Sequence, residues 1–281
     1  MRERRGDGRG PTARRRLIHG AVAWLAAATV AVAADRAAAL DLSVDMTLVL
    51  AVDTSASVDA EEYALQRGGL AAAFRDREVA EAIAAGPLKR IAVSVIEWAG
   101  AAQQVQVVAW TLVDGPGGAL ALADRIDSLE RAIPTGATSI AGALAFGTAL
   151  LRTAPYETAR RVIDLSGDGR NNQGQDVEDV RRVVVAQGVT INGLAILNEH
   201  PTLDYYFRDR VVGGTGAFVE VAHDYNAYVG AIRRKLIREI RSLTVSGRDP
   251  DPDPDPDRSP APATRLPESR VRLASAPPTA R

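Results

Sequence analysis

Short runs of branched apolar residues alternate with amphipathic stretches through the middle of the chain. The first apolar run covers residues 46–52 and ends at Asp53, a pattern typical of a strand buried on both faces of a parallel sheet. Asp59, with Glu62 three residues later, predicts a capped helix start, and apolar residues at helical spacing extend this helix to about Arg75. The unit is therefore a strand, a tight loop and a helix.

The same alternation continues along the chain. The remaining predicted elements are strands at 90–98 and 105–112, helices at 119–131 and 139–152, a strand at 161–166, a helix at 177–187, strands at 189–197 and 218–221, and a helix at 225–241. This order predicts an α/β fold with a doubly wound, mostly parallel central sheet that is flanked by helices on both faces. In such sheets, ligands bind outside the carboxyl ends of the strands.

The two ends of the chain differ from its middle in composition. Residues 1–39 contain an arginine-rich stretch, an apolar alanine-rich stretch and small-residue cleavage sequences. They predict a signal peptide and a periplasmic or extracellular protein, with an uncleaved membrane anchor as the alternative. Residues 247–281 contain an alternating Asp-Pro run and predict a disordered tail. We therefore expect one folded domain over residues 40–246.

Composition and charge narrow the chemistry of this domain. The chain has no cysteine and three histidines, which excludes thiolate sites and disfavours multi-histidine metal sites. Its formal net charge is −1 although residues 1–39 are rich in arginine, so the rest of the chain is acidic. Because no basic stripe stands out there, we do not expect nucleic acid as a partner. Any bound metal should be a hard ion with oxygen ligands.

Three predicted loops next to strands or helix starts carry small side chains with oxygen atoms. They are residues 53–57 (Asp-Thr-Ser-Ala-Ser), 136–139 (Gly-Ala-Thr-Ser) and 166–169 (Ser-Gly-Asp-Gly). Each loop alone would be interpreted as a helix cap or an Asx turn. Together they supply two carboxylates and three hydroxyls, which suit Mg²⁺ or Mn²⁺ with positions left for water and one incoming oxygen. The predicted metal ligands are Asp53, Ser55, Ser57, Thr138 and Asp168.

This set of residues resembles the metal ion-dependent adhesion site of von Willebrand factor type A (VWA) domains. The similarity lies in Asp53-x-Ser55-x-Ser57, the loop residue Thr138 and the third-loop residue Asp168. In that third loop a glycine stands before Asp168, where these domains usually have threonine. Further sequence segments resemble an exported bacterial subfamily of unassigned function (DUF1194-like). They are residues 97–100, 166–169 together with Asn171-Asn172, 191–196 and 213–218.

The resemblance implies a protein-binding module and not an enzyme. It implies that the hydroxyls of Ser55, Ser57 and Thr138 ligate the metal directly, that Asp53 binds it directly or through water, and that Asp168 supports it indirectly. An Asp or Glu side chain of a protein partner would complete the coordination. The weaker candidates Asn171 and Asn172 follow closely in the sequence and are expected to line the rim.

Two other functions remain open. Asp53 follows a buried strand, as does the nucleophile of haloacid-dehalogenase-like phosphatases, but the position of their acid–base aspartate is occupied by Ser55. The chain could instead be a structural envelope scaffold with a vestigial metal site.

The last predicted helix has a basic face. This pattern predicts an ordinary amphipathic helix whose charges face water, with peripheral contact to an anionic membrane as the alternative. The basic residues are Arg233, Arg234, Lys235, Arg238 and Arg241.

Overall fold

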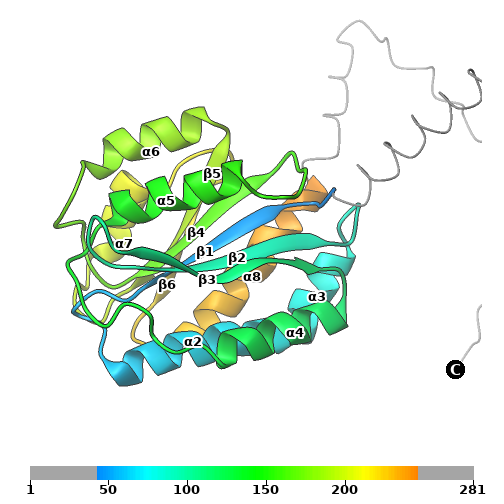
Figure 1. The fold of residues 1–281 in the computed structure, drawn as a ribbon, viewed down its shortest axis with the longest axis horizontal. Coiled ribbons are helices and arrows are strands. Elements are labelled where there is room, and N and C mark those ends of the chain that lie inside the picture. The colour runs from blue at the N-terminus through cyan, green and yellow to red at the C-terminus, as the bar shows by residue number, and fades with distance from the viewer. Residues whose placement is uncertain (1–42, 246–281) are drawn as a thin grey trace, which may run out of the picture. The chain divides into compact units, whose positions relative to one another are not determined.

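The computed structural model describes residues 43–245, and a six-stranded sheet in the order β3-β2-β1-β4-β5-β6 forms their centre (Figure 1). Every neighbouring pair of strands is parallel except β2 and β3, which are antiparallel. The predicted α/β fold with a mostly parallel, doubly wound sheet is therefore confirmed. The strands are β1 (Thr47–Asp53), β2 (Ile91–Trp98), β3 (Gln104–Val113), β4 (Arg161–Gly167), β5 (Val189–Ile196) and β6 (Val219–Ala222).

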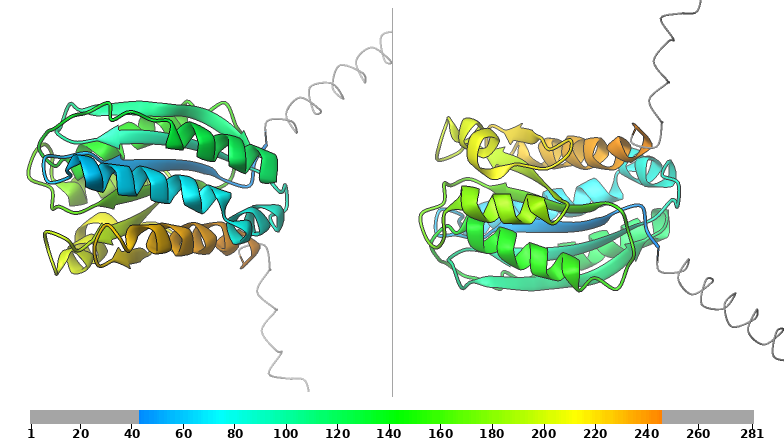
Figure 2. Two further views of the ribbon diagram at one scale, coloured as in Figure 1. Left: turned by 90° about the horizontal axis from the view of Figure 1, so that it is seen from below. Right: turned by 90° about the horizontal axis from the view of Figure 1, so that it is seen from above.

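Helices cover both faces of the sheet (Figures 1 and 2). Because successive side chains of a strand point to opposite faces, Leu48 and Leu50 of β1 pack into one core, and Val49 and Ala51 pack into the other. The first core lies under α2 (Ala60–Arg75), α3 (Arg77–Ala84), α4 (Pro116–Asp127) and α8 (Tyr228–Val245). The second lies under α5 (Ile140–Arg152), α6 (Val177–Ala186), α7 (Leu203–Tyr206) and the π-helical turn Phe207–Val211.

The start of α2 has the predicted capping box. The Asp59 side chain accepts a hydrogen bond from the backbone N–H of Glu62 at 2.8 Å, and the Glu62 side chain accepts one from the backbone N–H of Asp59 at 2.9 Å. These reciprocal bonds satisfy two donors at the helix start. They also fix where the loop after β1 ends, which matters because that loop carries two of the predicted metal ligands, Ser55 and Ser57.

Helix α4 begins and ends before the predicted helix at 119–131. Pro116 occupies its first turn, where proline is well tolerated, but the glycines that follow are weak helix formers and hid this start from the pattern. The helix ends at Asp127, and the backbone N–H of Ser128 bonds the carbonyls of Asp124 and Ile126. Residues 128–131 are consequently part of a loop.

Helix α8 corrects the expectation that its basic side chains all face water. Lys235 is 0% exposed and forms an ion pair with the buried Asp164 of β4. Arg233 forms ion pairs with Asp76 and Glu78. Lys235 is buried because a helix packed on a sheet places part of its circumference in the core. The positive charges of Lys235 and Arg233 are both neutralised within the domain.

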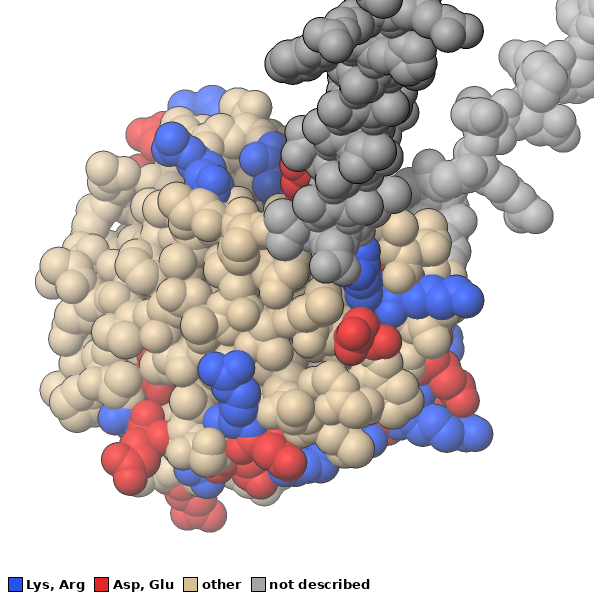
Figure 3. All heavy atoms as spheres, turned by 45° about the vertical axis from the view of Figure 1, so that its right-hand side comes forward, with Lys and Arg blue, Asp and Glu red and all other residues tan. Residues whose placement is uncertain are grey.

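The surface shows no basic patch in the view of Figure 3. Lysine and arginine side chains there lie among acidic ones, around a large uncharged area. No helix among residues 43–245 is both long and apolar enough to cross a membrane. The predicted signal peptide at residues 1–39 and the predicted tail at residues 247–281 lie outside the described residues.

Candidate metal site

The five predicted metal ligands come from three loops at one end of the sheet. Asp53 is the last residue of β1, Ser55 and Ser57 follow it, Thr138 precedes α5, and Asp168 follows β4. Strands β1 and β4 are adjacent and parallel, so their carboxyl ends bring the two aspartates to the same edge of the sheet.

Hydrogen bonds join four of these residues into one polar cluster. The Asp53 Oδ1 atom accepts a bond from the backbone N–H of Ser55 at 2.8 Å. The Oγ atoms of Ser55 and Ser57 lie 3.3 Å apart, and the Ser57 hydroxyl donates to Asp168 Oδ1 at 2.8 Å. Two carboxylates and two hydroxyls therefore converge, although they are up to 115 positions apart in the chain.

Asp53 places a buried carboxyl group in this cluster without a positive charge beside it. Its side chain is 0% exposed, and among the described residues its Oδ2 atom has no hydrogen-bond partner. Burial and the nearby charge of Asp168 raise the pKa of Asp53 to about 7. A buried carboxylate oxygen without a partner costs free energy, and a divalent cation bound there would remove that cost. The donor set therefore fits a hard metal ion.

The glycine before Asp168 has a steric explanation. A Cβ atom at Gly167 would lie 2.7 Å from Asp53 Oδ2 and 3.2 Å from Cζ2 of Trp98, so a side chain there would displace the carboxylate. The hydroxyl of Ser166 donates to the Ala51 carbonyl at 3.3 Å and belongs to the sheet. The departure from the usual VWA loop thus makes room for Asp53 and adds no hydroxyl to the cluster.

A hollow of about 230 Å³ lies beside these loops, and Ser57, Thr138 and Asp168 are part of its wall. Asn172 also lines the hollow and clamps Thr138, because its Oδ1 accepts from Thr138 N and its own N–H donates to Thr138 O, both at 2.9 Å. Asn171 does not line it. Its Oδ1 accepts from the backbone N–H of Ala141 at 3.2 Å, which attaches the loop to α5.

Three further residues support the cluster, and no pattern in the sequence predicts their roles. Arg131, in the loop after α4, donates to the carbonyls of Thr54 and Val58, each at 2.8 Å. The buried Glu97 accepts from the backbone N–H groups of residues 132 and 133 at 2.7 and 3.0 Å, which holds that loop. Tyr225 donates to Asp168 Oδ2 at 2.9 Å. Burial and the charges of Asp168 and Asp53 raise the pKa of Tyr225, so its hydroxyl keeps the donated proton.

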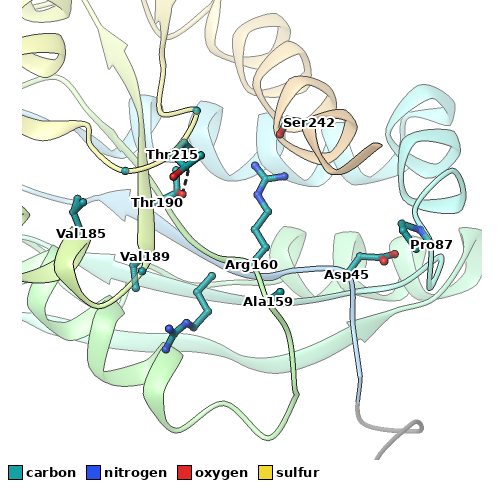
Figure 4. A pocket seen from close by; sticks show the side chains of 13 residues that line it. Asp45, Pro87, Ala159, Arg160, Val185, Val189, Thr190, Thr215 and Ser242 are labelled. Atoms are coloured by element: carbon teal, nitrogen blue, oxygen red, sulfur yellow. Dashed lines mark hydrogen bonds between the residues drawn. The ribbon is translucent and has the colours of Figure 1, made fainter. Parts of the chain in front are cut away.

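A larger hollow of about 530 Å³ lies at the opposite end of the sheet (Figure 4). Its polar groups are already paired within the protein: Arg160 forms an ion pair with the buried Glu239, and the Thr190 hydroxyl donates to the Thr215 carbonyl at 3.3 Å. Its wall includes none of the predicted metal ligands. The smaller hollow therefore remains the better candidate site.

The family model described as "Protein of unknown function (DUF1194)" matches residues 43–244. The chain belongs to the DUF1194 family. The residues that match the DUF1194 model include the whole sheet and all three loops of the candidate metal site. A comparison with curated proteins gave no match.

Solved structures share the fold of this DUF1194 chain at low sequence identity. Proximal thread matrix protein 1 of the mussel byssus has a TM-score of 0.52 and 15% identity over 71% of this chain and 47% of its own. The pilus adhesin SpaC from Lactobacillus rhamnosus GG has a TM-score of 0.51 and 12% identity over 70% and 31%. A D319A mutant of the PilB minor pilin from Streptococcus sanguinis has a TM-score of 0.51 and 15% identity over 73% and 64%.

The DUF1194 chain thus spans less than two thirds of each of these proteins. A von Willebrand factor type A protein from Catenulispora acidiphila also matches, with a TM-score of 0.47 and 13% identity over 70% of this chain and 43% of its own. The family match confirms the resemblance to the DUF1194 family that the sequence indicated, and the solved structures with TM-scores above 0.5 share the fold of the chain.

Proposed function

We propose that the chain is an exported, divalent-cation-dependent binding module, in which bound Mg²⁺ or Mn²⁺ captures an acidic side chain of a protein partner. The observation that carries this proposal is the buried, unpartnered Oδ2 atom of Asp53 beside Asp168 and the serine hydroxyls. This arrangement lacks positive charge, and a cation would supply it.

Each residue has its own task in this proposal. Asp53 supplies the buried negative charge, and Ser55, Ser57 and Thr138 supply neutral oxygens. Asp168 holds Ser57 in place, because its two oxygens accept from Ser57 and Tyr225. With mostly neutral ligands, a divalent ion keeps net positive charge and attracts a carboxylate. The hollow beside Ser57 and Thr138 is where the partner's Asp or Glu would enter.

The proteins that share the fold support binding and export. They include a pilus adhesin, a minor pilin and a byssus matrix protein. One structure of the mussel protein has zinc in its metal ion-dependent adhesion site (MIDAS) motif. Together with the leader predicted in residues 1–39, they favour an exported interaction module over an intracellular enzyme.

The alternatives fit these residues less well. A phosphatase needs Asp53 to reach its substrate, but this side chain is fully buried, and the hydroxyl of Ser55 cannot replace the carboxylic acid that protonates the leaving group. If the chain were a scaffold with a vestigial metal site, no cation would bind the buried Oδ2 atom of Asp53, and the free-energy cost of burying it would remain.

Calorimetric titration of Mg²⁺ and Mn²⁺ into the purified full chain tests the proposal. We expect saturable one-to-one binding in the wild type and none in Asp53→Ala or Ser55→Ala/Ser57→Ala, with circular dichroism showing that both variants are folded. Absence of metal uptake by the wild type, with and without an Asp-containing peptide, would overturn the proposal. Hydrolysis of an aryl phosphate that is lost in Asp53→Asn would favour the phosphatase instead.

A further inference from the structure

An arginine that forms no ion pair within the described part of the chain lines the hollow beside the metal site. Arg170 follows Asp168 by two positions, is exposed, and lines the hollow together with Ser57 and Thr138. Among residues 43–245 it forms no ion pair, whereas many other arginines of the domain do, for example Arg233 with Asp76. Its charge is therefore available to a ligand.

Arg170 is held in place without being neutralised. Its guanidinium carbon lies 5.6 Å from the centroid of the Tyr206 ring, and its Nη2 donates to Thr202 Oγ1 at 3.3 Å. Tyr206 is attached to the same loop, since its hydroxyl accepts from the backbone N–H of Asn171 at 3.3 Å. A guanidinium offers five N–H donors in a planar fork, and the hydrogen bond to Thr202 uses one of them.

The acidic groups around the hollow do not neutralise Arg170. The carboxylate of Asp168 already accepts bonds from Ser57 and Tyr225. Glu199 lines the hollow and adds negative charge, but it forms no ion pair with Arg170, and His200 lies beside it in the wall. The hollow thus offers a metal site and a positioned cation within one small space.

We infer that this hollow recognises a ligand with two acidic groups, one for the metal and one for Arg170, and that Arg170 determines this specificity. The inference rests on the proposed function, because it takes the metal as the first point of attachment. The fork of Arg170 matches the two oxygens of a carboxylate. The favoured partner is therefore a protein segment with two Asp or Glu residues close together, and a segment with one acidic residue binds more weakly.

Synthetic peptides with blocked, uncharged ends test this preference in the presence of Mn²⁺. One set has two aspartates separated by one to three glycines, and the matched set has asparagine in place of the second aspartate. By calorimetry on the full chain, we expect the best two-Asp peptide to bind about tenfold more tightly than its matched peptide, as one charge-assisted hydrogen-bonded pair would give.

Variants of Arg170 separate its role from that of the metal ligands. Arg170→Met should bind both peptides alike, with the affinity of the one-Asp peptide, and should take up Mn²⁺ like the wild type. Arg170→Lys, which keeps the charge but loses the fork, should retain part of the preference. Arg182→Met, which removes a 74% exposed arginine of α6, is the control and should keep all of it.

The outcomes distinguish this inference from the proposed function. If wild-type protein takes up Mn²⁺ and binds both peptides of each pair equally, the role of Arg170 is overturned while the metal-dependent capture of a carboxylate stands. A tenfold preference that persists in Arg170→Met also overturns it. If the wild type takes up no Mn²⁺ and binds neither peptide, both fail together.

Discussion

Gly167 determines where the carboxylate of Asp53 can lie. Gly167→Ala would place a methyl group 2.7 Å from Asp53 Oδ2 and 3.2 Å from Trp98 Cζ2, and both neighbours are fully buried. We expect calorimetry to show at least a tenfold loss of Mg²⁺ affinity, about 1.4 kcal/mol, in a protein that still unfolds cooperatively. Wild-type affinity in this variant would show that Asp53 is not a ligand.

Gly68→Ala provides the matched control for that substitution. A Cβ atom at Gly68, in helix α2, would meet nothing within 4 Å. Metal affinity should therefore be unchanged, and the free energy of unfolding should rise by up to about 1 kcal/mol because alanine favours a helix more than glycine does.

Some residues of the candidate site could be predicted from the sequence, and others could not, for a physical reason. Asp53 directly follows one predicted strand and Asp168 lies two residues beyond another, where α/β sheets bind ligands, so local pattern and topology were enough to select them. Arg131 and Tyr225 act on residues 77 and 57 positions away. An arginine or tyrosine with such distant contacts leaves no periodic trace in the sequence, and the same holds for Arg170.

At the scale of elements, the loop between β1 and α2 depends on the loop after α4. Arg131→Ala would remove the donors to the Thr54 and Val58 carbonyls. We expect the free energy of unfolding to fall by about 2 kcal/mol and metal affinity to fall with it, measured by denaturant unfolding and calorimetry. Arg131→Lys should retain only part of the stability and of the metal affinity, since an ammonium group lacks the planar fork of donors that a guanidinium has. Arg125→Ala, an exposed residue of α4, should change neither quantity appreciably.

Helix α8 is held on the sheet partly by a buried ion pair. Lys235→Met would leave Asp164 buried without its partner, and we expect a loss of about 3–5 kcal/mol in the free energy of unfolding. Adding Asp164→Leu should restore most of the loss, because well-packed apolar residues can replace such a pair. Denaturant unfolding of both variants checks this, and a double variant no more stable than Lys235→Met would contradict it.

The helices and strands could be predicted where apolar residues repeat with a single period along the whole element. Strand β1 and helix α2 have clear apolar patterns and boundaries within a residue of those expected. The segment from Leu203 to Val211 changes from an α-helix to a π-helical turn at Phe207, so no single period describes it. This unpredicted segment supplies Tyr206, which supports Arg170.

At the scale of the whole molecule, a metal that binds only the folded state stabilises it. Mg²⁺ at one hundred times its dissociation constant should add about 2.7 kcal/mol, which raises the thermal midpoint by roughly 5–10 °C for a domain of this size. Circular dichroism melts with Mg²⁺ and with chelator check this. Ser55→Ala/Ser57→Ala should show no rise, and an equal rise in that variant would place the stabilising ion elsewhere.

Both ends of the described chain lie away from the candidate site. Ser43 bridges to Glu157, and Asp45 and Ser242 line one hollow at the amino ends of the strands, whereas the three loops lie at the carboxyl ends (Figure 1). A domain tethered through either end would therefore present the proposed binding face outward. Many copies tethered to one surface would face the same way, so that avidity could turn individually weak carboxylate contacts into firm attachment.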